Sequence, residues 1–95
     1  MFLGAYHFTG DSAELLDGHD RLAAQFPPGT FDLHVCVAVD TGIVVFDACP
    51  SGEAFSGFSQ SPEFLAAVAT AGLPAPRVEA LGNVHSAELR APVTP

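Results

Sequence analysis

Residues 31–49 read FDLHVCVAVDTGIVVFDAC, and this stretch decides the fold because it predicts a central β-hairpin. Its odd positions from 33 to 39 are all Leu or Val, whereas the even positions include an acid, a histidine and a cysteine. Such alternation is typical of a strand with two unlike faces. The turn Asp40-Thr41-Gly42 then predicts a loop of two or three residues with Gly42 left-handed. Residues 43–49 are apolar on both faces except for Asp47, so we expect both faces to be covered.

The segments before the hairpin predict a strand and then a helix. Residues 2–9 mix aromatic and small side chains and end at Gly10, which indicates a strand. Asp11 followed three residues later by Glu14 is a helix-start signature. We expect this helix to run to about Phe26, because the two prolines that follow must end it.

The segments after the hairpin predict a second helix and a last strand. Ser51 is expected to cap this helix, which should kink or break near Gln60 because Ser61-Pro62-Glu63 looks like a fresh helix start. Gly72 is expected to end it. The last strand is predicted over residues 77–89, interrupted by Gly82.

The resulting order, β-α-β-β-α-β, predicts an α+β ferredoxin-like sandwich with a four-stranded antiparallel-type sheet and two helices on one face. Right-handed crossovers would place strands 2–9 and 43–49 in the centre of the sheet. The other face has nothing in the chain to cover it. We expect one domain over residues 1–90 and a flexible C-terminal tail over residues 91–95.

The composition excludes several classes of partner. The 95 residues include 3 basic and 11 acidic side chains, with a net charge of −8 and no lysine. This charge argues against binding to nucleic acid or to an anionic membrane surface. No apolar run approaches the roughly 20 residues of a membrane span. No targeting segment is visible and there are only two cysteines, so we expect a cytoplasmic protein with reduced thiols.

Three stretches carry a resemblance to a known family. The first combines His19, Pro27-Pro28-Gly29 and His34; the second runs from Gly42 to Phe55; the third joins residues 71–74 to Val84-His85. In these stretches the chain resembles small uncharacterised members of the dimeric α/β-barrel superfamily, which contains antibiotic-biosynthesis monooxygenase-like and stress-responsive barrel domains. The resemblance covers about residues 1–89. It implies a homodimer in which two sheet faces pair to close a barrel.

The same resemblance bears on the chemistry. Oxygenases of the superfamily, including haem-degrading ones, rely on a tryptophan, and this chain has none. The family also includes polyketide-cyclase-like enzymes that pair a strand histidine with a tyrosine, and here only Tyr6 is available.

The candidate site residues are polar side chains on otherwise apolar elements. The candidates for acid–base catalysis are His19, His85 and Asp47, and the candidates for ligand contacts are His19, His85, Tyr6, Phe46 and His34. No spacing matches a zinc, phosphate-loop, dinucleotide or nucleophile-elbow motif. With strands 2–9 and 43–49 taken as parallel, the strand histidines lie roughly 10 Å apart. We therefore expect no metal and no cofactor.

His19 and Asp47 allow alternative interpretations, and those given for His19 apply to His85 as well. His19 lies in the middle of the apolar stripe of the first helix, where it is either a hydrogen-bonded core-edge residue or a group facing a cavity between helix and sheet. Asp47 needs a partner because it is expected to be buried. That partner is either the N-terminus of the second helix or a histidine at a pocket.

Two functions of different classes follow. The first is a homodimeric domain that binds a small apolar or aromatic molecule and performs no chemistry. The second is a cofactor-independent monooxygenase, cyclase or isomerase with a histidine as general acid or base. Small residues on the sheet predict a cavity beneath the helices, and the uncovered apolar sheet face predicts a homodimer. Polar side chains converging in the pocket would favour the enzyme, whereas a lining of Phe and Val would favour the binder.

Overall fold

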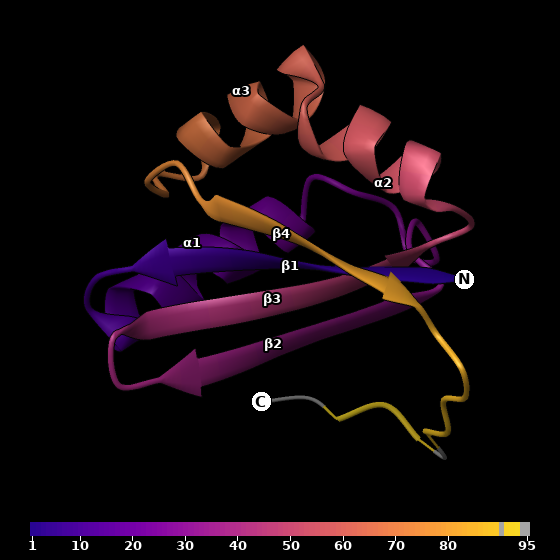
Figure 1. Ribbon diagram of the computed structural model, residues 1–95. Coiled ribbons are helices and arrows are strands. Elements are labelled where there is room, and N and C mark those ends of the chain that lie inside the picture. The colour runs from indigo at the N-terminus through magenta and orange to yellow at the C-terminus, as the bar shows by residue number, and fades with distance from the viewer. Residues whose placement is uncertain (90, 94–95) are drawn as a thin grey trace.

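The computed structural model describes residues 1–89 and 91–93 of the chain. The predicted domain boundary at residue 90 and the last two residues of the predicted tail lie outside the described residues. The elements, in order, are β1 (Phe2–Thr9), α1 (Ser12–Ala23), β2 (Leu33–Val39), β3 (Gly42–Cys49), α2 (Gly52–Ser59), α3 (Pro62–Thr70) and β4 (Arg77–Asn83). They form an α+β fold in which the helices lie on one side of the sheet (Figure 1).

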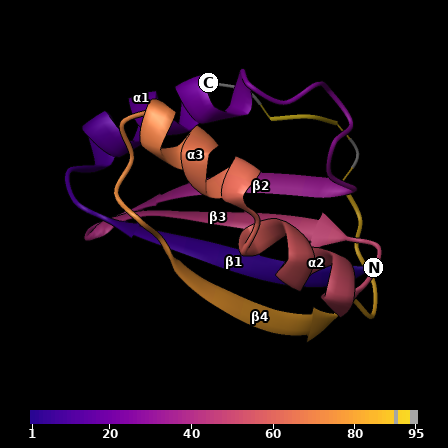
Figure 2. The same ribbon diagram turned by 90° about the horizontal axis from the view of Figure 1, so that it is seen from above.

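The four strands form an open antiparallel sheet in the order β2-β3-β1-β4. Strands β1 and β3 are antiparallel, with Phe2 opposite Cys49 and Thr9 opposite Gly42. The prediction that they run parallel is therefore wrong. Seen from above, α2 and α3 lie in front of the strands and run obliquely to them (Figure 2). His7 pairs with Val44 and so lies toward the opposite end of the sheet from Cys49.

Three elements differ from their predicted bounds. Helix α1 ends at Ala23 rather than Phe26, and its chain continues in tighter turns in which the amides of Gln25 and Phe26 donate to carbonyls three residues back. The predicted second helix is two helices, α2 and α3, so three helices rather than two cover the sheet. Strand β4 ends at Asn83 rather than residue 89, just after a register shift opposite Leu3 and Gly4.

The predicted helix starts are confirmed by their caps. The side chains of Asp11, Ser51 and Ser61 each accept a hydrogen bond from the amide three residues later. Each such cap stabilises its helix by about 1 kcal/mol. Helix α2 ends at Ser59, and Ser61 is already the N-cap of α3, which begins at Pro62. The predicted break therefore falls at Gln60.

The core lies between the sheet and the helices. It is built from apolar side chains of all three helices and of the central strands, including Tyr6, Phe8, Leu15, Leu22, Ile43, Val45, Phe55, Phe64 and Val68. Phe55 packs directly over Gly4, where a Cβ atom would lie 2.0 Å from the ring. Glycine at this position therefore lets α2 approach the sheet.

The opposite face of the sheet carries apolar side chains without a covering element. Cys36 packs against the core, so the alternate β2 residues point to the other side. These are Val35, Val37 and Val39, which are 36%, 39% and 37% exposed. Phe46 lies opposite Val35 on this face and is half-buried. Within residues 1–89 and 91–93, no helix combines the length and the apolar character needed to cross a membrane.

Candidate functional site

The hairpin register places a histidine directly opposite the buried acid. Val39 pairs with Gly42, so the loop has two residues, Asp40 and Thr41, and His34 falls opposite Asp47. Gly42 is required here, because its φ is +152° and a Cβ atom would lie 1.9 Å from the carbonyl oxygen of Phe8. Asp47 is 3% exposed, and its Oδ1 is hydrogen-bonded to Nδ1 of His34. Two partners were predicted for Asp47, the N-terminus of the second helix and a histidine. The structure shows the histidine, His34.

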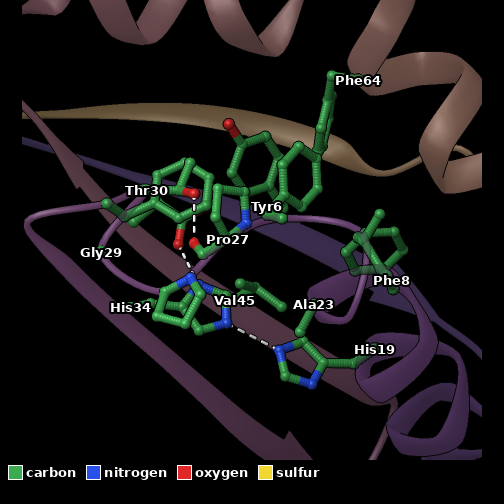
Figure 3. A pocket seen from close by; sticks show the side chains of 15 residues that line it. Tyr6, Phe8, His19, Ala23, Pro27, Gly29, Thr30, His34, Val45 and Phe64 are labelled. Carbon is green, nitrogen blue, oxygen red and sulfur yellow. Dashed lines mark hydrogen bonds and ion pairs between the residues drawn. The ribbon is translucent and has the colours of Figure 1, made fainter.

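His19 extends this pair toward the surface. It lies on α1, and its Nε2 is 2.8 Å from Nε2 of His34 (Figure 3). Its Nδ1 is 3.1 Å from Oδ1 of Asp20, which is exposed. A continuous row of hydrogen bonds therefore joins the buried carboxylate of Asp47 to a carboxylate in solvent.

The number of hydrogens in this row follows from its ends. With both carboxylates ionised, each end can only accept, so His34 must donate to Asp47 and His19 must donate to Asp20. The bond between the two rings needs a third N–H, one more than two neutral imidazoles possess. The row therefore suits one extra proton shared by the histidine pair, and it can hold or pass a proton between the interior and solvent.

A cavity of about 290 Å³ lies beside this row, between the sheet, α1, α3 and the segment that follows α1. Its lining is mostly apolar and consists of Tyr6, Phe8, His19, Leu22, Ala23, Phe26, Pro27, Pro28, Gly29, Thr30, Phe31, His34, Val45, Asp47 and Phe64. Figure 3 shows the two histidines pointing toward one another at one side of this space. The cavity thus has aromatic walls and one polar end.

The cavity arises differently from the prediction. None of the small sheet residues expected to create it lines it, and the space over Gly4 is filled by Phe55. The cavity is instead bounded by residues 26–31, where the Pro27-Pro28 segment carries the chain away from α1 before β2 begins. Thr30 donates to the Pro27 carbonyl at 2.6 Å, which holds this turn.

Within the described part of the chain, one fully buried polar side-chain atom of the lining has no partner. Tyr6 is 1% exposed, and its hydroxyl makes no hydrogen bond within the described residues. Burial, and then the nearby charges of Asp47 and Cys49, raise the pKa of Tyr6 well above its ordinary value. Tyr6 is therefore a neutral donor at any physiological pH.

The candidate residues divide into two groups. Tyr6, His19, His34 and Asp47 come together at the cavity. Phe46 lies on the opposite face of the sheet, because its neighbours Val45 and Asp47 point toward the helices. His85 is exposed and lies beyond the end of β4, outside the lining.

Other side chains at the site were not predicted. Asp20 ends the histidine row, and Phe31 stacks on His34 with ring centroids 5.8 Å apart. Phe26 and Phe64 complete the aromatic wall. A signal for Phe26 and Phe31 was present in the sequence, since both flank the double proline that forms the cavity rim.

The cysteines and the remaining histidine do not build a second site. His7 pairs with Glu79 at 2.8 Å. Burial first, and then nearby carboxylates, raise the pKa of both the Cys36 and Cys49 thiols, so neither is an activated nucleophile. Among the residues that the structure describes, no three histidine, cysteine or acidic side chains could together hold a metal ion.

No protein-family model, curated protein or solved structure matches this chain.

Proposed function

We propose that this protein is a homodimeric ferredoxin-like domain of the dimeric α/β-barrel type that binds a small apolar or aromatic molecule in a cavity of each subunit. The observation that carries this proposal is the cavity of about 290 Å³ with aromatic walls and a single polar end. Apolar clefts with a few placed polar groups are the usual sites for small molecules. The volume lies at the lower end of the usual range, which suits a compact ring system.

The walls favour a flat ligand. Phe26 and Phe31, at the two ends of the segment 26–31, and Phe64 of α3 present aromatic surface to the cavity. The ring centroids of Phe26 and Phe31 are 6.2 Å apart. A planar ring inserted among them gains aromatic contacts in addition to burial of its area. The polar end formed by His34 and Asp47 would orient such a ring.

The dimer part of the proposal is supported by the uncovered sheet face. Three exposed valines of β2 and the half-buried Phe46 of β3 lie on it, which is an apolar surface of the kind that marks association sites. A second copy of the chain covers it in an isologous pairing, since both partners would contribute the same surface.

A second function is favoured by the histidine row. His34 is held by a buried carboxylate and borders the cavity, which is the arrangement of an oriented general acid or base. His19 would exchange the proton with solvent through Asp20. In this version the protein is a cofactor-independent monooxygenase, cyclase or isomerase acting on an aromatic molecule.

The test of binding uses naphthalene and a pair of matched variants. Ala23 lines the cavity and is exposed, so Ala23→Trp places an indole at its entrance. Ala24→Trp places the same group one residue further, outside the lining. We expect naphthalene to shift amide NMR signals of cavity residues in the wild type and in Ala24→Trp, and to lose at least about tenfold in affinity in Ala23→Trp. Equal affinity in the two variants, or no saturable binding to the wild type, would overturn the proposal.

A further inference from the structure

Two imidazole nitrogens point directly at one another beside the cavity. His19 of α1 and His34 of β2 meet through their Nε2 atoms, which are 2.8 Å apart (Figure 3). The ring centroids are 5.1 Å apart and the ring planes are inclined by 14°. The distance between the centroids exceeds the distance between the nitrogens by about the diameter of an imidazole ring, so both nitrogens lie on the line that joins the ring centres.

A carboxylate holds the far side of each ring. Nδ1 of His34 is hydrogen-bonded to the buried Asp47, and Nδ1 of His19 lies 3.1 Å from Oδ1 of Asp20. An ionised carboxylate only accepts, so each Nδ1 carries the hydrogen and each Nε2 of a neutral ring carries a lone pair. Two lone pairs that face one another require a cation between them. A shared proton is one such cation, and a metal ion is another.

The same arrangement surrounds histidines that bind metals. A metal-binding histidine usually donates its other N–H to a carboxylate, which fixes the ring and makes the free nitrogen a stronger ligand. Both His19 and His34 meet this condition. Their side chains are 13% and 35% exposed, so an ion can enter from solvent. The prediction that no metal binds considered the histidines of the strands and did not pair His34 with His19 of the helix.

The number and direction of the ligands select the ion. Within the described part of the chain, no third histidine, cysteine or acidic side chain completes a metal site. Zinc in proteins prefers four ligands arranged as a tetrahedron, whereas Cu(I) forms linear complexes with two imidazoles. A monovalent ion also replaces the shared proton without changing the charge of the row. We propose that His19 and His34 bind one Cu(I) ion in line between their Nε2 atoms.

A small movement of His19 makes room for the ion. A metal–imidazole bond is about 2 Å long, so the ion needs the two nitrogens about 4 Å apart rather than the 2.8 Å of the hydrogen bond. Asp20 follows His19 in the chain and its side chain is 64% exposed, so the two residues can shift outward together while His34 stays on Asp47. This inference does not depend on which molecule occupies the cavity.

The test measures affinity for Cu(I) without oxygen, by competition with the chromophoric chelator bicinchoninate. We expect the wild type to take up one Cu(I) per chain and to bind Zn(II) far more weakly. His19→Gln removes one of the two ligands and leaves His34 bonded to Asp47, so the protein should fold and lose at least about a hundredfold in affinity. Cu(I) is diamagnetic, so nitrogen-15 NMR should also show the Nε2 signals of His19 and His34 shifting as it binds.

Two further variants serve as controls. His7→Gln removes a histidine that is likewise bonded to a carboxylate, Glu79, but that lies on the other face of the sheet from its cavity-lining neighbours. Thiolates are the strongest competing ligands for Cu(I), and Cys36 is the less buried of the two thiols, so Cys36→Ala is measured as well. Both variants should bind Cu(I) as the wild type does.

The outcomes decide between the histidine pair and other ligands. Unchanged affinity in His19→Gln, or no uptake by the wild type, would overturn the proposal. A loss in Cys36→Ala as large as that in His19→Gln would assign the ion to a thiol and would also overturn it. Zn(II) bound as tightly as Cu(I) by the wild type would contradict a site with two ligands in line.

Discussion

His34 and Asp47 lie directly opposite one another on β2 and β3 and are joined by a hydrogen bond between Nδ1 and Oδ1. This cross-strand pair supplies the buried carboxylate with a partner and fixes the orientation of the imidazole at the cavity. His19 then occupies the other ring nitrogen of His34. The chemistry of the site thus depends on a register that is set by a two-residue loop.

Removal of His34 alone should be costly. His34→Leu leaves Asp47 buried without its partner, and breaking such a pair costs about 3 kcal/mol in free energy of unfolding. His19→Leu should cost only about 1 kcal/mol, because both bonds that it removes, to His34 and to Asp20, lie nearer the surface and leave Asp47 paired with His34. Urea denaturation of both variants gives the comparison.

A double variant checks the reason for that cost. His34→Leu combined with Asp47→Leu removes both partners, so it should be more stable than His34→Leu alone. Equal instability of the single and double variants would show that shape rather than the unpaired carboxylate is responsible.

Ionisation of Tyr6 should lower the stability of the fold in alkaline solution. Its pKa is raised in the folded state by burial and then by the charge of Asp47, so the folded protein keeps this proton longer than the unfolded chain does. The free energy of unfolding should therefore fall as the pH rises above about 10, the ordinary value of tyrosine. The Tyr6→Phe variant lacks this dependence.

Denaturation of the wild type and Tyr6→Phe at a series of pH values isolates the effect. Near neutral pH the variant should be at least as stable as the wild type, since the hydroxyl has no partner to lose. Only in alkaline solution should the free energy of unfolding of the variant increase relative to that of the wild type. A stability difference that stays constant across the series is incompatible with a raised pKa.

Gly4 should not tolerate a side chain. A Cβ atom at this position would lie 2.0 Å from the ring of Phe55, so Gly4→Ala must displace a core aromatic and should cost about 1–3 kcal/mol. Gly57 in α2 is the control, because a Cβ atom there meets nothing within 4 Å. Gly57→Ala should stabilise the helix by about 0.5–1 kcal/mol. Thermal unfolding of both variants should give shifts of opposite sign.

The proposed dimer can be tested with a charge on the uncovered sheet face. Val37→Arg would place an unpaired cation in the interface, whereas Leu65→Arg changes a side chain of α3 that is 49% exposed. We expect sedimentation equilibrium to give a dimer for the wild type and Leu65→Arg, and a monomer for Val37→Arg. A wild type that sediments as a monomer at micromolar concentration would refute the dimer.

Much of the local structure was predictable because it depends on neighbours in sequence. The caps at Asp11 and Ser51 and the break near Gln60 follow from side chains within three residues of the helix starts. The extent of β4 was not predictable, since its pairing with β1 shifts near Gly82. That shift depends on the tertiary pairing rather than on the strand's own pattern.

The candidate site could be predicted only in part. His19 and Asp47 were identified as polar residues on apolar elements, but the hairpin register was left open between loops of two and three residues. Only the two-residue loop places His34 opposite Asp47, and the requirement for Gly42 beside the Phe8 carbonyl, which sets it, is a contact between distant strands. His85 looked similar in sequence, yet its position beyond β4 depends on where that strand ends.

The central claim is that the cavity, and not the apolar sheet face, receives an aromatic ligand. Intermolecular nuclear Overhauser effects between naphthalene and the isotope-labelled protein distinguish the two surfaces directly. We predict contacts from naphthalene to the rings of Phe31 and His34, which line the cavity. Contacts confined to Val35 and Val37 on the opposite face would contradict the claim.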